Sequence, residues 1–92
     1  MIRLKLLPPL TRIVGESEVL VDLDHGPLWL VLERAVAQNG KFRRALSDRA
    51  GQLSDEYACL VNGDRYNMSA LGDVEVDERD QITVLLPLAG GA

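Results

Sequence analysis

Residues 80–92 read Asp-Gln-Ile-Thr-Val-Leu-Leu-Pro-Leu-Ala-Gly-Gly-Ala. Residues 81–86 divide into two alternating sets, one of which is wholly apolar. An alternation with a period of two is typical of a β-strand that buries one face. Proline then interrupts the pattern, because it has no N–H for a sheet ladder. This stretch therefore predicts a last strand that stops at Pro87, followed by a short tail containing Gly90 and Gly91. The two alternating sets are Ile82, Val84 and Leu86 against Gln81, Thr83 and Leu85.

Four further strands are predicted at residues 2–7, 18–23, 57–62 and 65–67. The first two alternate in the same way, and we expect them to pair antiparallel. The last two flank Asn62-Gly63, which favours a tight hairpin turn because both residues accept a positive φ.

A helix is predicted at about residues 27–39, where the spacing of the apolar residues changes from every second residue to every third or fourth residue. Gly26-Pro27 can open the helix, with proline at its first position. Asn39-Gly40 supplies a stop, since either residue tolerates the left-handed conformation of a helix C-terminus. The polar segment 41–56 predicts a short helical turn and then a loop. The apolar stripe of the helix consists of Leu28, Val31, Leu32, Ala35 and Val36.

The element order is strand, strand, helix, strand, short strand, strand. A sheet with one main helix across one face is the simplest two-layer solution, so the fold class is α+β. We expect one domain over residues 1–87 and a tail at 88–92, which includes one residue after the second glycine. The predicted core consists of Ile2, Leu4, Val19, Val21, Leu28, Leu32, Val36, Val61, Ile82 and Val84.

The composition excludes several classes of protein. The 92 residues suffice for one modest core, and the net charge of −4 is not that of a basic nucleic-acid binder. The single cysteine, Cys59, cannot form an intramolecular disulfide and fits the cytoplasm. No apolar run approaches the roughly 20 residues of a membrane span, and charges interrupt residues 1–7 where a signal peptide would be apolar. We therefore expect no nucleic-acid or membrane partner.

This order of elements, with Val61-Asn62-Gly63 and the ending at residues 80–91, resembles the family of the molybdopterin synthase small subunit and the thiamine sulfur carrier (MoaD/ThiS). The likeness covers essentially the whole chain. The resemblance implies a ubiquitin-like β-grasp fold, in which the first and last strands lie parallel at the centre of a mixed sheet.

The resemblance also implies a function. An E1-like enzyme would use ATP and Mg²⁺ to adenylate the carboxylate of the second glycine, and sulfur would then displace AMP to leave a thiocarboxylate. The chain would be a carried co-substrate and not an enzyme, with no cofactor or metal of its own. By position, Gly91 would carry the sulfur and Gly90 would thread a narrow channel in the partner. A sulfur-acceptor synthase subunit would be the second partner, in molybdopterin, thiamine or cysteine biosynthesis.

The chain departs from this family in continuing to Ala92. Family members that work directly end at the second glycine, so the glycyl adenylate requires removal of Ala92. A peptidase could trim this residue, it could be a cloning remnant, or the protein could follow another cycle. Two other functions stay open. One is a ubiquitin-like modifier conjugated through Gly91 to target amines, and the other is a β-grasp interaction module without tail chemistry.

Outward-facing leucines give a separate signal for a partner. If Ile2 and Ile82 face the helix, Leu7 and Leu85 point to the opposite side. With Tyr66 and Leu88 they would form an apolar patch at the base of the tail, suited to a partner. In the resembled family this sheet face docks both the activating enzyme and the sulfur acceptor. The alternative is a set of scattered apolar surface residues.

Other chemically notable residues have structural interpretations. Cys59 lies within a strand without a visible base, so we expect a buried small hydrophobe. His25 is expected in a surface loop, and the acidic stretch from Asp73 to Asp80 in a solvated turn and not in a metal site. Trp29 adjoins the apolar stripe of the helix and is expected in the core or partly buried.

Overall fold

The computed structural model describes residues 1–47, 54 and 56–85. Most of the loop predicted within residues 41–56, the predicted end of the last strand at residues 86–87, and the tail at 88–92 lie outside the described residues. The elements, in chain order, are β1 (Ile2–Leu6), α1 (Leu10–Val14), β2 (Glu18–Val21), β3 (His25–Pro27), α2 (Leu28–Gln38), α3 (Gly40–Leu46), β4 (Ala58–Val61), β5 (Asp64–Asn67), the 3₁₀ helix η1 (Met68–Asp73), β6 (Glu75–Asp77) and β7 (Ile82–Leu85).

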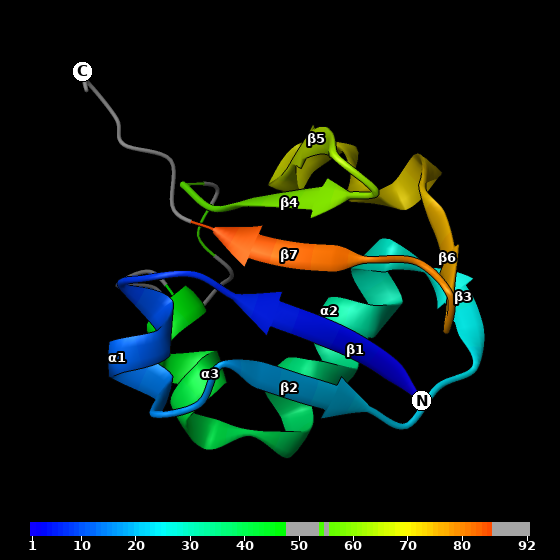
Figure 1. The fold of residues 1–92 in the computed structure, drawn as a ribbon. Helices are drawn as coiled ribbons and strands as arrows, with labels where there is room; N and C mark the ends of the chain where they lie inside the picture. The colour runs from blue at the N-terminus through cyan, green and yellow to red at the C-terminus, as the bar shows by residue number, and fades with distance from the viewer. Residues whose placement is uncertain (48–53, 55, 86–92) are drawn as a thin grey trace.

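A five-stranded sheet forms one layer, in the order β2-β1-β7-β4-β5 (Figure 1). The first and last strands, β1 and β7, are parallel neighbours, and Leu4 lies opposite Ile82. The other pairs are antiparallel. This arrangement confirms the predicted mixed sheet, with the C-terminal strand at its centre.

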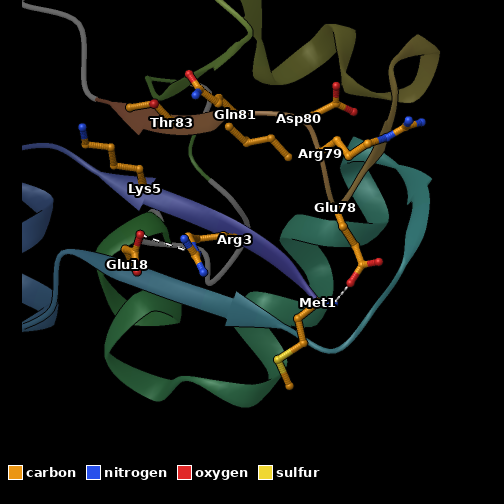
Figure 2. A pocket seen from close by; sticks show the side chains of 10 residues that line it. Met1, Arg3, Lys5, Glu18, Glu78, Arg79, Asp80, Gln81 and Thr83 are labelled. Atoms are coloured by element: carbon orange, nitrogen blue, oxygen red, sulfur yellow. Dashed lines mark hydrogen bonds and ion pairs between the residues drawn. The ribbon is translucent and has the colours of Figure 1, made fainter.

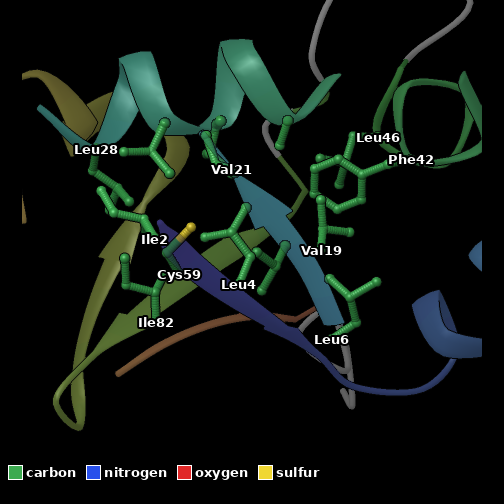
Figure 3. Packing of buried hydrophobic residues seen from close by; sticks show 14 of the residues in the cluster. Ile2, Leu4, Leu6, Val19, Val21, Leu28, Phe42, Leu46, Cys59 and Ile82 are labelled. Carbon is green, nitrogen blue, oxygen red and sulfur yellow. The ribbon is translucent and has the colours of Figure 1, made fainter. Parts of the chain in front are cut away.

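The helical layer covers one face of this sheet. In Figure 1, α2 and α3 lie behind the strands. In β1, Ile2, Leu4 and Leu6 are buried while Arg3 and Lys5 are exposed, as the period of two predicts. Figure 3 shows the side chains of Ile2, Leu4 and Leu6 packing toward the helices. Every residue of the predicted core is buried except Val36, which packs against the cluster and stays partly exposed.

The junction between α2 and α3 differs from the prediction. The helix α2 ends at Gln38, as the predicted stop requires, but Asn39 has φ −135° and is extended, so the expected left-handed conformation is wrong. Gly40 instead begins α3, and the Asn39 side-chain oxygen accepts a hydrogen bond from the Phe42 N–H at 3.0 Å. Asparagine is a favoured N-cap because this bond satisfies a backbone donor at the start of a helix. One residue thus ends α2 and caps the helix that buries Phe42 and Leu46. The start of α2 also differs from the prediction. Proline was expected at the first helical position, but α2 begins at Leu28, and Pro27 precedes it in an extended conformation.

The structure adds a second, two-stranded sheet of β3 and β6. The acidic stretch is therefore not a solvated turn throughout, because Val74 and Val76 are buried between its exposed carboxylates. The backbone N–H of Leu28 donates to the Val74 carbonyl at 2.8 Å, which connects the start of α2 to this sheet. The helix α1, which buries Leu10 and Val14, was not predicted from the sequence.

The predicted hairpin between β4 and β5 is confirmed, with positive φ at Asn62 (52°) and Gly63 (91°). The Asn62 side chain also donates to Asp80 at 2.8 Å and accepts from the Gln81 N–H at 2.9 Å. A backbone bond of 2.9 Å joins the Asn62 N–H to the Gln81 carbonyl. Asn62 therefore ties the hairpin to the segment that enters β7.

Replacing Asn62 by alanine should lower the free energy of unfolding by about 2 to 4 kcal/mol, through loss of the side-chain bonds and strain at positive φ. Asn62→Gly keeps the backbone conformation accessible, so it should cost less, about 1 kcal/mol. Urea denaturation of both variants measures the difference. Equal losses would show that positive φ contributes nothing at this turn.

Candidate functional site

The sheet face opposite the helices carries the first candidate site. Leu7 follows β1, and its N–H donates to the Val84 carbonyl at 3.3 Å, which holds it beside β7. Val84 is buried under the helices, so Leu85 points to the opposite side. Leu7 is 36% exposed and Leu85 is partly exposed. The structure thus places both leucines as predicted, at the end of the sheet where the chain leaves β7.

Tyr66 does not join them. The turn at Asn62-Gly63 fixes the register of β5, and Tyr66 lies directly opposite Cys59. Directly paired residues project to the same side of a sheet, and Tyr66 packs against the core. The prediction that Tyr66 belongs to the outward patch is therefore wrong.

The same register supplies another apolar residue to the outer face. Leu60 lies opposite Thr83 of β7 and alternates with buried Cys59 and Val61, so it projects outward. We call Leu7, Leu60 and Leu85 the outer patch. Leu88 lies outside the described residues, and a partner contact at any of these positions stays a prediction.

Polar side chains border the outer patch along β1 and β2. Lys5 lies between Glu18 and Thr83 in the register, and Arg3 forms an ion pair with Glu18 at 3.7 Å. Figure 2 shows these residues around an open pocket of about 450 Å³. At one end the Met1 amino group donates to Glu78, and this bond raises the pKa of the amino group. Charged side chains thus make up most of the described lining of this pocket, which includes no cysteine, serine or histidine.

The carboxylates that enter β7 organise a turn. Asp77 accepts bonds from the Arg79 backbone and guanidinium at 2.8 and 3.2 Å, and these bonds lower the pKa of its carboxyl group. Asp80 accepts from the Asp77 N–H at 2.7 Å. Within residues 1–47 and 56–85 no cluster of His, Cys, Asp and Glu is arranged to hold a metal ion. Nor does any helix of this part combine the length and apolar character needed to cross a bilayer.

Cys59 is fully buried, which confirms its structural interpretation. Burial raises the pKa of its thiol to about 12, so the thiol stays protonated at neutral pH. His25 is exposed as expected, although it lies in β3 and not in a loop.

Trp29 is 44% exposed, so it is partly buried and does not lie in the core, which was the other expected place. The helix turns Leu28, Val31, Leu32 and Ala35 toward the sheet. Trp29 lies about 100° around the helix axis from Leu28, at the edge of the buried stripe.

The tail residues Gly90, Gly91 and Ala92 lie outside the described residues. The structure does locate the strand that precedes them. β7 is the central strand, and its last residue, Leu85, belongs to the outer patch. The described part of the site therefore ends at Leu85 of the outer patch. The chemistry assigned to Gly90 and Gly91 stays a prediction.

Comparison with solved structures identifies the fold. The structure superposes on SAMP1 from Haloferax volcanii with a TM-score of 0.76, at 25% identity over 98% of both chains. The chain has the ubiquitin-like β-grasp fold. SAMP1 from Methanosarcina acetivorans, small archaeal modifier protein 1, gives a TM-score of 0.69 at 19% identity, over 98% of this chain and 95% of that one. Urm1 from Sulfolobus solfataricus gives 0.62 at 19% identity, over 92% and 99%.

The β-grasp fold expected from the resemblance is thus confirmed. No protein-family model matches the sequence, and comparison with curated proteins gave no significant match. Membership of the MoaD/ThiS family stays a prediction. The fold alone does not assign a function to this chain, because one fold can carry unrelated functions.

Proposed function

We propose that this protein is a sulfur carrier whose C-terminal Gly91, after removal of Ala92, is adenylated by an E1-like enzyme and converted to a thiocarboxylate. The position of the outer patch carries the proposal. Leu7 and Leu85 are apolar, outward-facing and located where the chain leaves the central strand. A partner that covers this patch would lie beside the point where the chain continues from β7 into the tail.

The chemistry requires a catalyst outside this chain. Adenylation joins the Gly91 carboxylate to the α-phosphorus of Mg²⁺-bound ATP and releases pyrophosphate. Hydrosulfide from the sulfur donor then attacks the acyl carbon and AMP leaves, so a C–S bond replaces the C–O bond to the phosphate and a thiocarboxylate remains. The single cysteine of the chain is buried and protonated, so it is not suited to supply this sulfur. We therefore assign catalysis to the activating enzyme and acceptance of the sulfur to a biosynthetic synthase subunit, both in the cytoplasm.

Glycine suits the activated position for a steric reason. A residue without Cβ lets another backbone or a nucleotide approach closely and reaches conformations closed to other residues. An extended chain advances about 3.3 Å per residue, so the segment from Leu86 to Gly91 is long enough to enter a neighbouring active site. Ala92 blocks the reaction until a peptidase removes it.

A ubiquitin-like modifier is the second candidate. The names of the similar structures favour it, because two of them are called small archaeal modifier protein 1. The same Gly91 adenylate would then acylate an amine of a target protein, which forms an amide bond with release of AMP. The two functions share the tail, the activating enzyme and the outer patch, and they differ in the final nucleophile.

Intact-mass measurement tests the proposal. The protein ending at Gly91 is incubated with its activating enzyme, ATP, Mg²⁺ and a sulfur donor. A product heavier by the difference between one sulfur and one oxygen atom supports sulfur carriage. Amide-linked ladders on cellular proteins, without this product, would favour the modifier. If neither product forms and deletion of residues 90–92 has no effect in cells, the chain is an interaction module without tail chemistry.

Leu85→Asp should weaken the complex with the activating enzyme by about tenfold or more, because it places an unpaired charge in an apolar contact. The side chain is partly exposed, so folding should persist. Leu20→Asp is the matched control, since Leu20 is 47% exposed on β2, the edge strand of the same sheet. Calorimetry of folding and titration of binding separate the two effects. An unfolded Leu85→Asp protein, or equal weakening by Leu20→Asp, would contradict the outer patch as the contact.

A further inference from the structure

The helix α2 presents a large aromatic residue to solvent at the edge of its buried face. Trp29 is the single tryptophan of the chain, and it is 44% exposed. Glu33 and Ala37 follow it at i+4 and i+8 and are both exposed. Residues four apart lie one above the other on a helix. We call these three residues the Trp29 stripe.

An exposed indole leaves a large apolar area in water. Tryptophan is enriched among the residues that carry most of the energy of protein interfaces. Core packing does not explain this exposure, since four other residues of α2 make its buried face. The Trp29 stripe therefore has the character of a contact surface.

The charges near the stripe define the chemistry of a partner. Among the described residues, no basic side chain forms an ion pair with Glu33. The segments packed against the start of α2 add Asp73 at the end of η1 and Glu75 opposite Pro27. Arg34 and His25 are the nearby basic residues in sequence, and carboxylates outnumber basic groups over the whole chain. A cationic partner is favoured.

We propose that Trp29 and Glu33 together bind an arginine side chain of a partner protein. A guanidinium can stack on the indole face, within about 6 Å of the ring centre. Its planar fork can also form two hydrogen bonds with one carboxylate. Side chains at i and i+4 have Cβ atoms about 5 to 6 Å apart, so one arginine spans both contacts. Ala37 is small and leaves room for the partner backbone along the helix.

This site is separate from the outer patch. The Trp29 stripe lies in the helical layer, whereas the leucines lie on the opposite face of the sheet. A protein on α2 would leave the outer patch uncovered. The inference is independent of the proposed sulfur chemistry, and its test requires no activating enzyme.

The test uses tetra-arginine, capped at both ends, with tetra-lysine as the comparison. Trp29 fluorescence and backbone amide shifts are followed during titration. We expect arginine to bind several-fold more tightly than lysine, because guanidinium stacks better on indole. The shifts should map to residues 29–37.

Two matched variants locate the site. Glu33→Gln should weaken tetra-arginine binding about fivefold, through loss of the charged hydrogen bonds. Glu18→Gln makes the same charge change on the opposite face of the sheet and should leave the affinity unchanged. Trp29→Leu keeps an apolar residue but should remove the preference for arginine over lysine, as measured by amide shifts.

Three outcomes would overturn the proposal. The first is an equal affinity for the two peptides, with shifts confined to the acidic turn at residues 77–80. The second is an equal effect of the two Glu→Gln substitutions. The third is burial of Trp29 by self-association in sedimentation experiments, or by anionic lipid vesicles, without any response to tetra-arginine.

Discussion

Replacing Phe42 by alanine should lower the free energy of unfolding by about 3 to 5 kcal/mol, the range for a buried phenylalanine. Phe42 is fully buried in α3, a short helix that packs against both α1 and α2. Removing the ring leaves a cavity where these helices meet the sheet. Small domains are stabilised by only about 5 to 15 kcal/mol in total. Urea denaturation should therefore show a midpoint far below that of the unchanged protein, or no folded state.

Two variants keep this prediction testable if the alanine protein does not fold. Phe42→Leu retains most of the buried volume and should cost less than Phe42→Ala. Lys41→Ala changes an exposed neighbour in the same helix and should alter stability by no more than about 0.5 kcal/mol. A loss at Phe42→Ala no larger than that at Lys41→Ala would show that α3 contributes little to the core.

The elements predicted from the sequence are those with a clear period. β1, β7 and α2 each repeat their apolar residues often enough to reveal both the element and its buried face. This is why burial of Leu32 and Val84, and the outward direction of Leu85, could be predicted from residue spacing.

The missed elements depend on contacts distant in sequence. β3 and β6 have three residues each, too few to display a period, and they exist because they pair with each other. Asn39-Gly40 resembles a helix stop when read locally. Asn39 does end α2, but in an extended conformation, and it also caps α3, in which Phe42 is buried. Local propensity is overridden here by tertiary packing.

The same two effects, residue spacing and contacts distant in sequence, explain why only part of the candidate site could be predicted. The parallel register of β1 and β7 brings Leu7 beside Leu85, whereas the hairpin turn assigns Tyr66 to the helix side. Trp29 adjoins the buried stripe and is only partly buried, because Leu28 and Leu32 decide which face of α2 turns to the sheet. The roles of Gly90 and Gly91 rest on resemblance and lie beyond the described residues.

The chain as given should form no Gly91 thiocarboxylate, whereas a version ending at Gly91 should form it. Adenylation requires a free carboxylate at the residue that will carry sulfur, and a peptide bond joins Gly91 to Ala92. Both proteins are incubated with activating enzyme, ATP, Mg²⁺ and sulfur donor, without peptidase, and their intact masses are compared. The expected contrast is complete, because the missing group is a reactant.

Gly91→Val in the shortened protein should abolish the product, since a β-branched side chain restricts the backbone and adds bulk where the nucleotide must approach. Folding should not change, because the described core ends at Val84 and the variant lies beyond β7. An unchanged urea midpoint therefore serves as the control, and it assigns the lost product to the tail. Formation of the thiocarboxylate on the full-length chain, with Ala92 still attached by mass, would rule out both the trimming step and Gly91 as the acceptor.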